Sequence, residues 1–502
     1  MHRIKDYAAD FAATHRHLLI LLSILLLASF LRLWQLGALP LGLLSSEASL
    51  SLQAQDLASY PVEISLSLFV YAQALAVNIL EPSALTVRVV TAAVSILTVI
   101  TTYMAAKVWL GERTALLAAF FMAVSTWALH LGRIAEPINW WLWLLPLHAW
   151  LWHRSLATDR SVWYVFTGIS LGLLVYTPVP VWVVVVAVIA VWVYFLRLHR
   201  LQLQRHVQQL LIVVSSAALT LTPALLYLLI TGDMGFLQSE VAVVEQLSKL
   251  WQDPAAAANA AVATLGMFHF QGSLDPAYNV PGQPQLDLGT GVFMVLGGLV
   301  VVRRWKQPVY GTLLVVAGAL IASILLISVT APDPVSAALT LPVVVLLAAI
   351  GVHELIRRWL GVFPRNIVAR WFGAVFIAVT LAMVALYSWQ HYFVAWANTP
   401  EAIATYDEAA VVVAEHIERQ PEHAVIVIYE EEQQPIYEYM LGDRDKEVEL
   451  VSTAHAEAAD LEQFEQVYDV TSHGAAIEEA THLDTLESRL IAGEELVRIY
   501  TY

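Results

Sequence analysis

The chain has 502 residues, of which 59% are hydrophobic and 14% charged, and its mean hydropathy is +0.65. Soluble globular proteins carry roughly 25% charged residues, so the composition excludes an ordinary soluble protein and predicts a membrane protein. The absence of cysteine excludes disulfides, a thiolate nucleophile and a cysteine metal site. The net charge of −16 argues against a nucleic-acid partner, because an acidic protein is repelled by phosphates.

Long apolar runs predict about eleven transmembrane helices, since a span needs about 20 mostly apolar residues. The first run, Leu18 to Leu36, is too long for a typical signal-peptide core and is interpreted as a retained span. The predicted spans are 18–36, 86–109, 114–131, 138–152, 162–179, 180–196, 207–230, 289–302, 308–330, 335–356 and 370–389.

The run Ile64–Leu80 is ambiguous, and the distribution of Lys and Arg decides its interpretation. If this run does not cross the membrane, the basic clusters near 107, 154, 200, 304 and 357 all lie on the side of the basic N-terminus. We therefore predict a helix that lies at the outer interface or re-enters it. The N-terminus, 1–17, is then cytoplasmic, and the transmembrane region, 18–395, carries large outer loops at 37–85 and 231–288.

The region 396–502 is predicted to be an acidic extracytoplasmic α/β domain. From Glu401 onward the chain has 25 acidic and 5 basic residues. The run Glu408–Ile417 predicts a helix, and Ala424–Tyr429, Val448–Ser452 and Glu495–Tyr502 predict strands. The expected fold class is thus a polytopic α-helical membrane protein with a small C-terminal α/β domain.

The first outer loop carries a candidate catalytic carboxylate. The segment from Phe30 to Leu57, FLRLWQLGALPLGLLSSEASLSLQAQDL, ends an apolar helix, turns, and then places Glu47 just outside the membrane. A partly buried carboxylate at the mouth of a helix bundle is suited to act as a general base or to hold a metal. The alternative is that Glu47 is an ordinary interfacial carboxylate.

This segment resembles the first outer loop of the type-C glycosyltransferases. That family includes dolichyl-phosphate-mannose protein mannosyltransferases and bacterial aminoarabinose transferases, whose bacterial members typically read Arg-x-x-x-Leu-Gly-x-x-Pro-x-Gly-Leu-x-x-Asp-Glu-Ala. The resemblance continues, in the same order, through 83–134, 168–180, 265–287 and 391–407. The matching residues of the first loop are Arg32, Leu36, Gly37, Pro40, Gly42, Leu43, Glu47 and Ala48.

The resemblance implies a cavity formed by the outer loops, where a polyprenyl-phosphate-linked sugar is transferred to an acceptor with inversion. It implies Glu47 as the base that deprotonates the acceptor. Membrane lipids are expected partners, the acceptor is a glycan, a lipid or a protein, and the location is a bacterial plasma membrane. The predicted substrate-binding residues are Arg88, Arg133, Glu136, His269, Asp275 and Asn279.

Some of these residues also have simpler interpretations. Arg133 is a phosphate partner in one interpretation, and in the other its side chain merely extends to the interface. Glu136 is a substrate contact or caps the helix that follows Pro137. His269 is a ligand or an ordinary loop residue. The sequence names no cofactor and no metal site, and it leaves a requirement for a divalent metal open.

The sequence departs from the family pattern at three presumed site positions. Ser46 stands where the family has Asp, Gly272-Ser273 replaces an expected Gly-Asp, and 331–342 has no Arg. Such losses favour an alternative function, a non-catalytic glycosyltransferase-like protein that binds a lipid-linked glycan or partner proteins. A transporter is disfavoured, because the predicted spans lack paired breaks and mid-helix charges.

Overall fold

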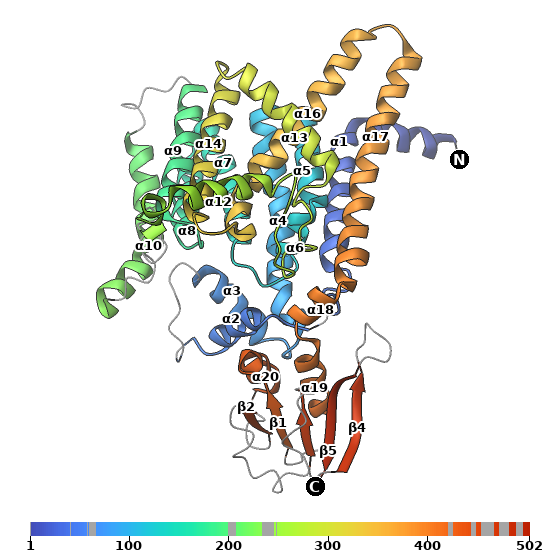
Figure 1. The fold of residues 1–502 in the computed structure, drawn as a ribbon. Helices are drawn as coiled ribbons and strands as arrows, with labels where there is room; N and C mark the ends of the chain where they lie inside the picture. Colours follow the sequence, from blue (N-terminus) through green and yellow to red (C-terminus); the bar gives the residue numbers. More distant parts are fainter. Residues whose placement is uncertain are drawn as a thin grey trace. The chain divides into compact units, whose positions relative to one another are not determined.

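The structure is a computed structural model that describes residues 2–40, 42–57, 59, 67–198, 207–232, 245–246, 248–419, 425–442, 448–452, 466–470, 481–487 and 495–501. The described chain is mostly helical, with a five-stranded sheet near the C-terminus (Figure 1). It divides into two compact units. The first unit comprises 1–34, 63–69 and 91–392, and the second comprises 35–62, 70–90 and 393–502.

Each predicted span overlaps a helix. The predicted span 114–131 is interrupted at Ser125, whose backbone is not helical (φ −57°, ψ 122°) and which caps the second of two helices. The helices at the predicted spans are α1 (His2–Leu33), α4 (Ala84–Leu110), α5 (Glu112–Val124), α6 (Thr126–Leu131), α7 (Asn139–Thr158), α8 (Ser161–Val175), α9 (Val181–Leu198), α10 (Val207–Thr231), α13 (Leu288–Arg303), α14 (Pro308–Ile327), α16 (Leu341–Val362) and α17 (Ile367–Trp389).

Six helical segments in the described part of the chain are long and apolar enough to cross a membrane. The protein is therefore a multi-pass membrane protein, but the predicted number of eleven spans is not confirmed. Helix α3 (Ser67–Val77) lies within the ambiguous run Ile64–Leu80. Its 11 residues rise only about 16 Å, about half of the hydrocarbon thickness of a bilayer. Its place at the outer interface stays a prediction.

The first unit is held together by close helix contacts at small residues. Helices α13 and α16 meet at Gly297 and Gly351, where a Cβ atom would lie 1.8 Å from the Leu347 carbonyl oxygen and 2.1 Å from the Phe293 carbonyl oxygen, respectively. Small residues allow such approach in membrane proteins, where dispersion contacts and hydrogen bonds drive helix association. The prediction of a polytopic helical fold is confirmed.

The second unit contains the predicted α/β domain. Its sheet has the order β2-β1-β3-β5-β4. Strand β1 pairs in parallel with β2 and β3, whereas β5 pairs antiparallel with β3 and β4. Two strands, β3 and β4, and helix α20 were not predicted from the sequence. The elements are α18 (Pro400–Thr405), α19 (Glu408–Arg419), β1 (Val425–Tyr429), α20 (Gln434–Leu441), β2 (Val448–Ser452), β3 (Gln466–Asp469), β4 (Thr481–Glu487) and β5 (Glu495–Thr501).

The position of β1 explains its sequence. All five residues of VIVIY are buried, as expected for a central parallel strand that is covered on both faces. Helix α20 connects β1 to β2, which gives the crossover that parallel neighbours require. Helix α20 also packs against α2 (Ser45–Gln55) of the first outer loop. Residues of that loop and of the C-terminal region therefore share one compact unit.

The α13–α16 contact predicts the effect of one added methyl group. We expect Gly297→Ala to lower the stability of the purified protein by about 1–3 kcal/mol, since overpacking against a backbone carbonyl forces the helices apart. The matched control is Gly298→Ala on the same helix, where a Cβ atom meets nothing within 4 Å. The control should leave the melting temperature in detergent unchanged or slightly raised. Equal melting temperatures for the two variants would contradict the contact.

Candidate functional site

Glu47 lies in the first turn of α2, the helix that follows the turn around Pro40 and Gly42 in the first outer loop. This turn is called the first-loop turn. Glu47 is the third residue of α2, and its Oε2 accepts a hydrogen bond from the Leu44 N–H at 3.1 Å. A carboxylate at this position satisfies a backbone donor that a helix N-terminus leaves without a partner, and its charge is favourable there. The Glu47 residue is only 1% exposed. Local helix chemistry therefore contributes to fixing this carboxylate.

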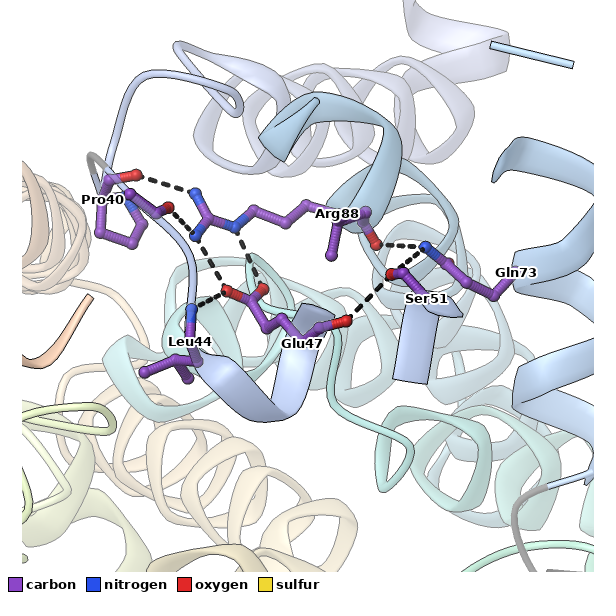
Figure 2. A network of polar contacts seen from close by, with 8 residues as sticks. Pro40, Leu44, Glu47, Ser51, Gln73 and Arg88 are labelled. Atoms are coloured by element: carbon purple, nitrogen blue, oxygen red, sulfur yellow. Dashed lines mark hydrogen bonds and ion pairs between the residues drawn. The ribbon is translucent and has the colours of Figure 1, made fainter. Parts of the chain in front are cut away.

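Arg88, on α4, forms a two-point ion pair with Glu47 (Figure 2). Its Nε donates to Glu47 Oε1 at 3.1 Å and its Nη2 donates to Oε2 at 2.9 Å. Nη1 donates to the Pro40 carbonyl at 2.8 Å, and Nη2 also donates to the Gly42 carbonyl at 2.7 Å. Arg88 is fully buried. The guanidinium thus joins α4 to both sides of the first-loop turn.

Tyr406, from the C-terminal region, contacts both Arg88 and the first-loop turn. The Arg88 guanidinium carbon lies 5.6 Å from the ring centroid of Tyr406, which is itself buried. Gly42 has φ of +84°, and a Cβ atom on it would lie 1.9 Å from the Tyr406 carbonyl oxygen. Only glycine combines this backbone conformation with such close approach. Tyr406 is a member of this site that the sequence did not indicate, because it lies more than three hundred residues from the loop.

A series of hydrogen bonds connects the Glu47–Arg88 pair to Gln73 on α3. Gln73 is buried, and its Nε2 donates to the Val87 carbonyl at 2.9 Å. Its contact with Ser51 Oγ is 3.5 Å, and that hydroxyl donates to the Glu47 carbonyl at 2.9 Å (Figure 2). Helices α2, α3 and α4 are therefore connected through one buried network. Hydrogen bonds between buried polar groups favour one arrangement of the elements that carry them.

The other predicted residues lie in the first unit, where two buried arginines cap helix ends. Arg133 donates from Nη1 to the carbonyls of Leu31 and Arg32, in the last turn of α1, each at 3.0 Å. Arg32 in turn donates to the carbonyls of Met122 and Ala123, in the last turn of α5, at 3.0 and 2.9 Å. Carbonyls at a helix C-terminus lack intrahelical partners and favour cations. The Arg133 side chain is thus buried.

Glu136 and Asp275 lie near one tyrosine. Tyr278 OH donates to Glu136 Oε2 at 3.4 Å. Burial raises the pKa of the Tyr278 phenol, and the charges of Glu136 and Asp275 act in the same direction, so the phenol keeps its proton. Asp275 caps a local turn, since its Oδ1 accepts from the Ala277 N–H at 2.9 Å. Asp275 is exposed and Glu136 is half-buried, so both differ from Glu47 in access to solvent.

Asn279 and His269 contact the helices around their loop. Asn279 is buried, and its Oδ1 lies 3.0 Å from Nε2 of His391, in the π-helix Gln390–Ala395 that follows α17. His269 Nε2 lies 3.3 Å from the Gly291 carbonyl on α13. The ring of His130 lies 4.8 Å from the ring of Tyr392, which also faces the Arg133 guanidinium at 5.0 Å. His130, His391 and Tyr392 were not predicted, since only the fold brings them together.

The described residues contain no group of three or more His, Cys, Asp or Glu side chains that could hold a metal ion.

The predicted site residues fall into two groups. One group, Glu47 and Arg88, lies in the second unit, and the other, Arg133, Glu136, His269, Asp275 and Asn279, lies in the first. Their roles toward a substrate stay predictions.

Comparison with known structures covers nearly the whole chain. ArnT from Cupriavidus metallidurans in the apo state matches with a TM-score of 0.56 and 12% identity, over 97% of this chain and 98% of that chain. The chain has the type-C glycosyltransferase fold. ArnT from the same organism bound to undecaprenyl phosphate matches similarly, with a TM-score of 0.55, 12% identity, and the same coverage of 97% and 98%.

Two other comparisons cover less of this chain or of the matched protein. A family model for dolichyl-phosphate-mannose-protein mannosyltransferases matches residues 67–227. The apo oligosaccharyltransferase of Archaeoglobus fulgidus matches with 15% identity over 89% of this chain and 66% of that chain, at a TM-score of 0.47. No curated protein sequence matches the chain. The resemblance to type-C glycosyltransferases predicted from the sequence is confirmed.

The buried ion pair predicts a large stability effect. We expect Glu47→Gln to lower the unfolding free energy by about 3–5 kcal/mol, because it leaves the Arg88 charge buried without a counter-charge. The double variant Glu47→Gln with Arg88→Gln should lose less than the sum of the single changes, since the two residues are coupled. Chemical unfolding in detergent measures both.

The control for this pair is Glu415→Gln, which breaks an ion pair with Arg419 whose side chains are 27% and 73% exposed. An ion pair with this much access to solvent contributes about 0–1 kcal/mol. If Glu47→Gln lowers the unfolding free energy no more than this control does, the buried pair does not stabilise the first loop.

The contact of Gly42 with Tyr406 is tested by a second glycine with the same backbone conformation. Gly42→Ala should be more destabilising than Gly111→Ala, by about 1–3 kcal/mol of overpacking. Both glycines have φ of +84°, but a Cβ atom on Gly111 meets nothing within 4 Å. The difference between their melting temperatures therefore isolates the contact. Equal losses would show that only the backbone conformation matters.

Proposed function

We propose that the protein is a membrane glycosyltransferase that moves a sugar from a polyprenyl-phosphate donor to an acceptor on the outer face of the membrane. The observation that carries this proposal is the match to ArnT along 97% of the chain, including a form with undecaprenyl phosphate bound. The family match at 67–227 and the multi-pass helical architecture support the same class of substrate. Extracytoplasmic placement of the site follows from the predicted topology.

The Glu47–Arg88 pair combines the two groups that this chemistry needs. A guanidinium binds phosphate oxygens in the same two-point manner in which Arg88 holds the Glu47 carboxylate. In the proposed mechanism, the anionic phosphate of the donor competes for Arg88. This competition releases a Glu47 oxygen toward the acceptor. The buried pair is then the resting state, and binding of the donor prepares the base.

The proposed reaction is a single displacement at the anomeric carbon. Glu47 takes the proton of the acceptor hydroxyl or amine, and the acceptor atom forms a bond to the anomeric carbon. The bond between that carbon and the phosphate oxygen breaks on the opposite side, and its electron pair leaves on polyprenyl phosphate. General base catalysis of this kind contributes roughly 10²–10⁴ in rate. The Arg88 charge stabilises the departing phosphate.

Residues of the first unit are proposed as substrate contacts separately from the Glu47–Arg88 pair. Arg133 would bind an anionic group, and Glu136, His269 and Asn279 would contact a sugar or an acceptor. Asp275 is exposed and Glu136 half-buried, so these two carboxylates are the alternative bases. A requirement for a divalent metal is a separate proposal, which the assay of sugar release with and without the metal tests.

A non-catalytic, donor-binding protein is the second candidate function. Two observations favour it: Ser46 stands where the family has its usual Asp, and Glu47 is 1% exposed with hydrogen bonds to both of its carboxylate oxygens. A serine hydroxyl is not a base at neutral pH. In this case the Glu47–Arg88 ion pair would only stabilise the first outer loop, and donor binding would not break it.

The decisive measurement is sugar release from a panel of polyprenyl-phosphate monosaccharides by purified protein in nanodiscs, with and without a divalent metal. We expect turnover by the wild type and a loss of 10²-fold or more in Glu47→Gln. Donor binding by the same Glu47→Gln preparation shows that it is folded. Glu401→Gln is the control, since it removes an exposed carboxylate from α18 in the same unit.

Each outcome separates the two candidates. Saturable donor binding without turnover by the wild type supports the non-catalytic function. Turnover in Glu47→Gln equal to that of Glu401→Gln rejects Glu47 as the base, and Glu136→Gln and Asp275→Asn are then tested in its place.

A further inference from the structure

Two connected apolar grooves lie among α1, α5, α16 and α17, which Figure 1 shows as neighbours in the first unit. The first groove has a volume of about 540 Å³ and runs along α1, α5 and α16. The second has a volume of about 550 Å³ and runs along α16 and α17. They share four lining residues, Leu117, Ile356, Leu360 and Leu381, so they adjoin, and the two together are called the branched groove.

Basic side chains border the branched groove. His17, Arg113, His353 and Arg357 line the first groove, and Arg370 lines the second. They come from three separate parts of the sequence, near 17, 113 and 353–370, and each was placed by the positive-inside rule on the cytoplasmic side. The remaining lining residues of the first groove are all apolar.

No Asp or Glu is among the described residues that line either groove. The neighbouring acids are already paired. Glu354 binds three arginines, Arg304 at 3.1 Å, Arg357 at 2.7 Å and Arg358 at 2.8 Å. Glu112, next to Arg113, binds Lys107 at 2.6 Å. Arg113 forms no ion pair with any described residue and is exposed. The border of the grooves therefore keeps an excess of positive charge beside an apolar interior.

We propose that this branched groove binds an anionic phospholipid, with its phosphate at Arg113 and Arg357 and its two acyl chains in the two grooves. The lack of an acidic partner disfavours the ammonium group of a zwitterionic headgroup. The two connected branches match two acyl chains better than the single chain of a polyprenyl lipid. Basic pockets between helices at a membrane interface have this kind of ligand. The proposal does not depend on the glycosyltransferase activity.

The test measures lipid binding to the purified full-length protein in neutral detergent by native mass spectrometry. Phosphatidylglycerol should bind saturably and more tightly than phosphatidylcholine or a polyprenyl phosphate. Loss of one interfacial arginine is expected to weaken phosphatidylglycerol binding about five-fold. Arg113→Gln should show this loss, and Arg113→Lys should restore binding because it keeps the charge.

Two further variants separate headgroup from chain recognition. Leu360→Trp fills the shared part of the grooves and should weaken phosphatidylglycerol binding without removing charge. Arg303→Gln removes an exposed arginine that lines neither groove, and it should leave binding unchanged. Unchanged melting temperatures in the absence of lipid show that the variants are folded.

Several outcomes overturn the proposal. Equal affinity for phosphatidylglycerol and phosphatidylcholine would remove the role of the basic border. Equal losses in Arg113→Gln and Arg303→Gln would indicate nonspecific surface attraction. Competition by glycerophosphoglycerol, the headgroup without chains, at the affinity of the intact lipid would show a site for a soluble phosphate. Tighter binding of polyprenyl phosphate would assign the groove to that lipid.

Discussion

The arrangement of the first outer loop in the second unit depends on one buried charge pair. Arg88 holds Glu47 through two hydrogen bonds and holds the first-loop turn through the carbonyls of Pro40 and Gly42. Because burying a charge without a partner costs several kcal/mol, neither residue is stable in this position without the other. The tight contact between Gly42 and Tyr406 ties the C-terminal region to the same turn. A candidate catalytic carboxylate is therefore also a structural element.

This dual role gives the proposed chemistry a physical constraint. A base has to approach the proton that it removes, yet Glu47 is buried and bonded to a cation. A phosphate that binds Arg88 equally well would offset the cost of opening the pair, so the donor itself would make the base available. A molecule that lacks such an anion would leave the pair closed. Substrate selection and stability would then depend on the same interaction.

Arginines have a related structural role in the first unit. Arg133 binds the last carbonyls of α1, and Arg32 binds the last carbonyls of α5. Within a membrane protein, carbonyls at a buried helix end have no water to replace the missing hydrogen bonds, and a guanidinium offers several donors at once. Arginines that a sequence motif marks as functional thus also determine where helices end. Their substitution is expected to alter structure as well as any contact with substrate.

The sequence by itself determined the membrane class, the apolar ranges that become helices, and helix α19 and three of the strands in the C-terminal region. These follow from local hydropathy and periodicity, which need no knowledge of distant residues. It also selected Glu47 and Arg88 through the resemblance to a family. The tertiary structure alone decided that these two residues pair, that Tyr406 lies against Arg88, and that His391 contacts Asn279. The short strand β3, the sheet order and these contacts depend on residues that are far apart in the chain, and only packing and the burial of charge bring them together.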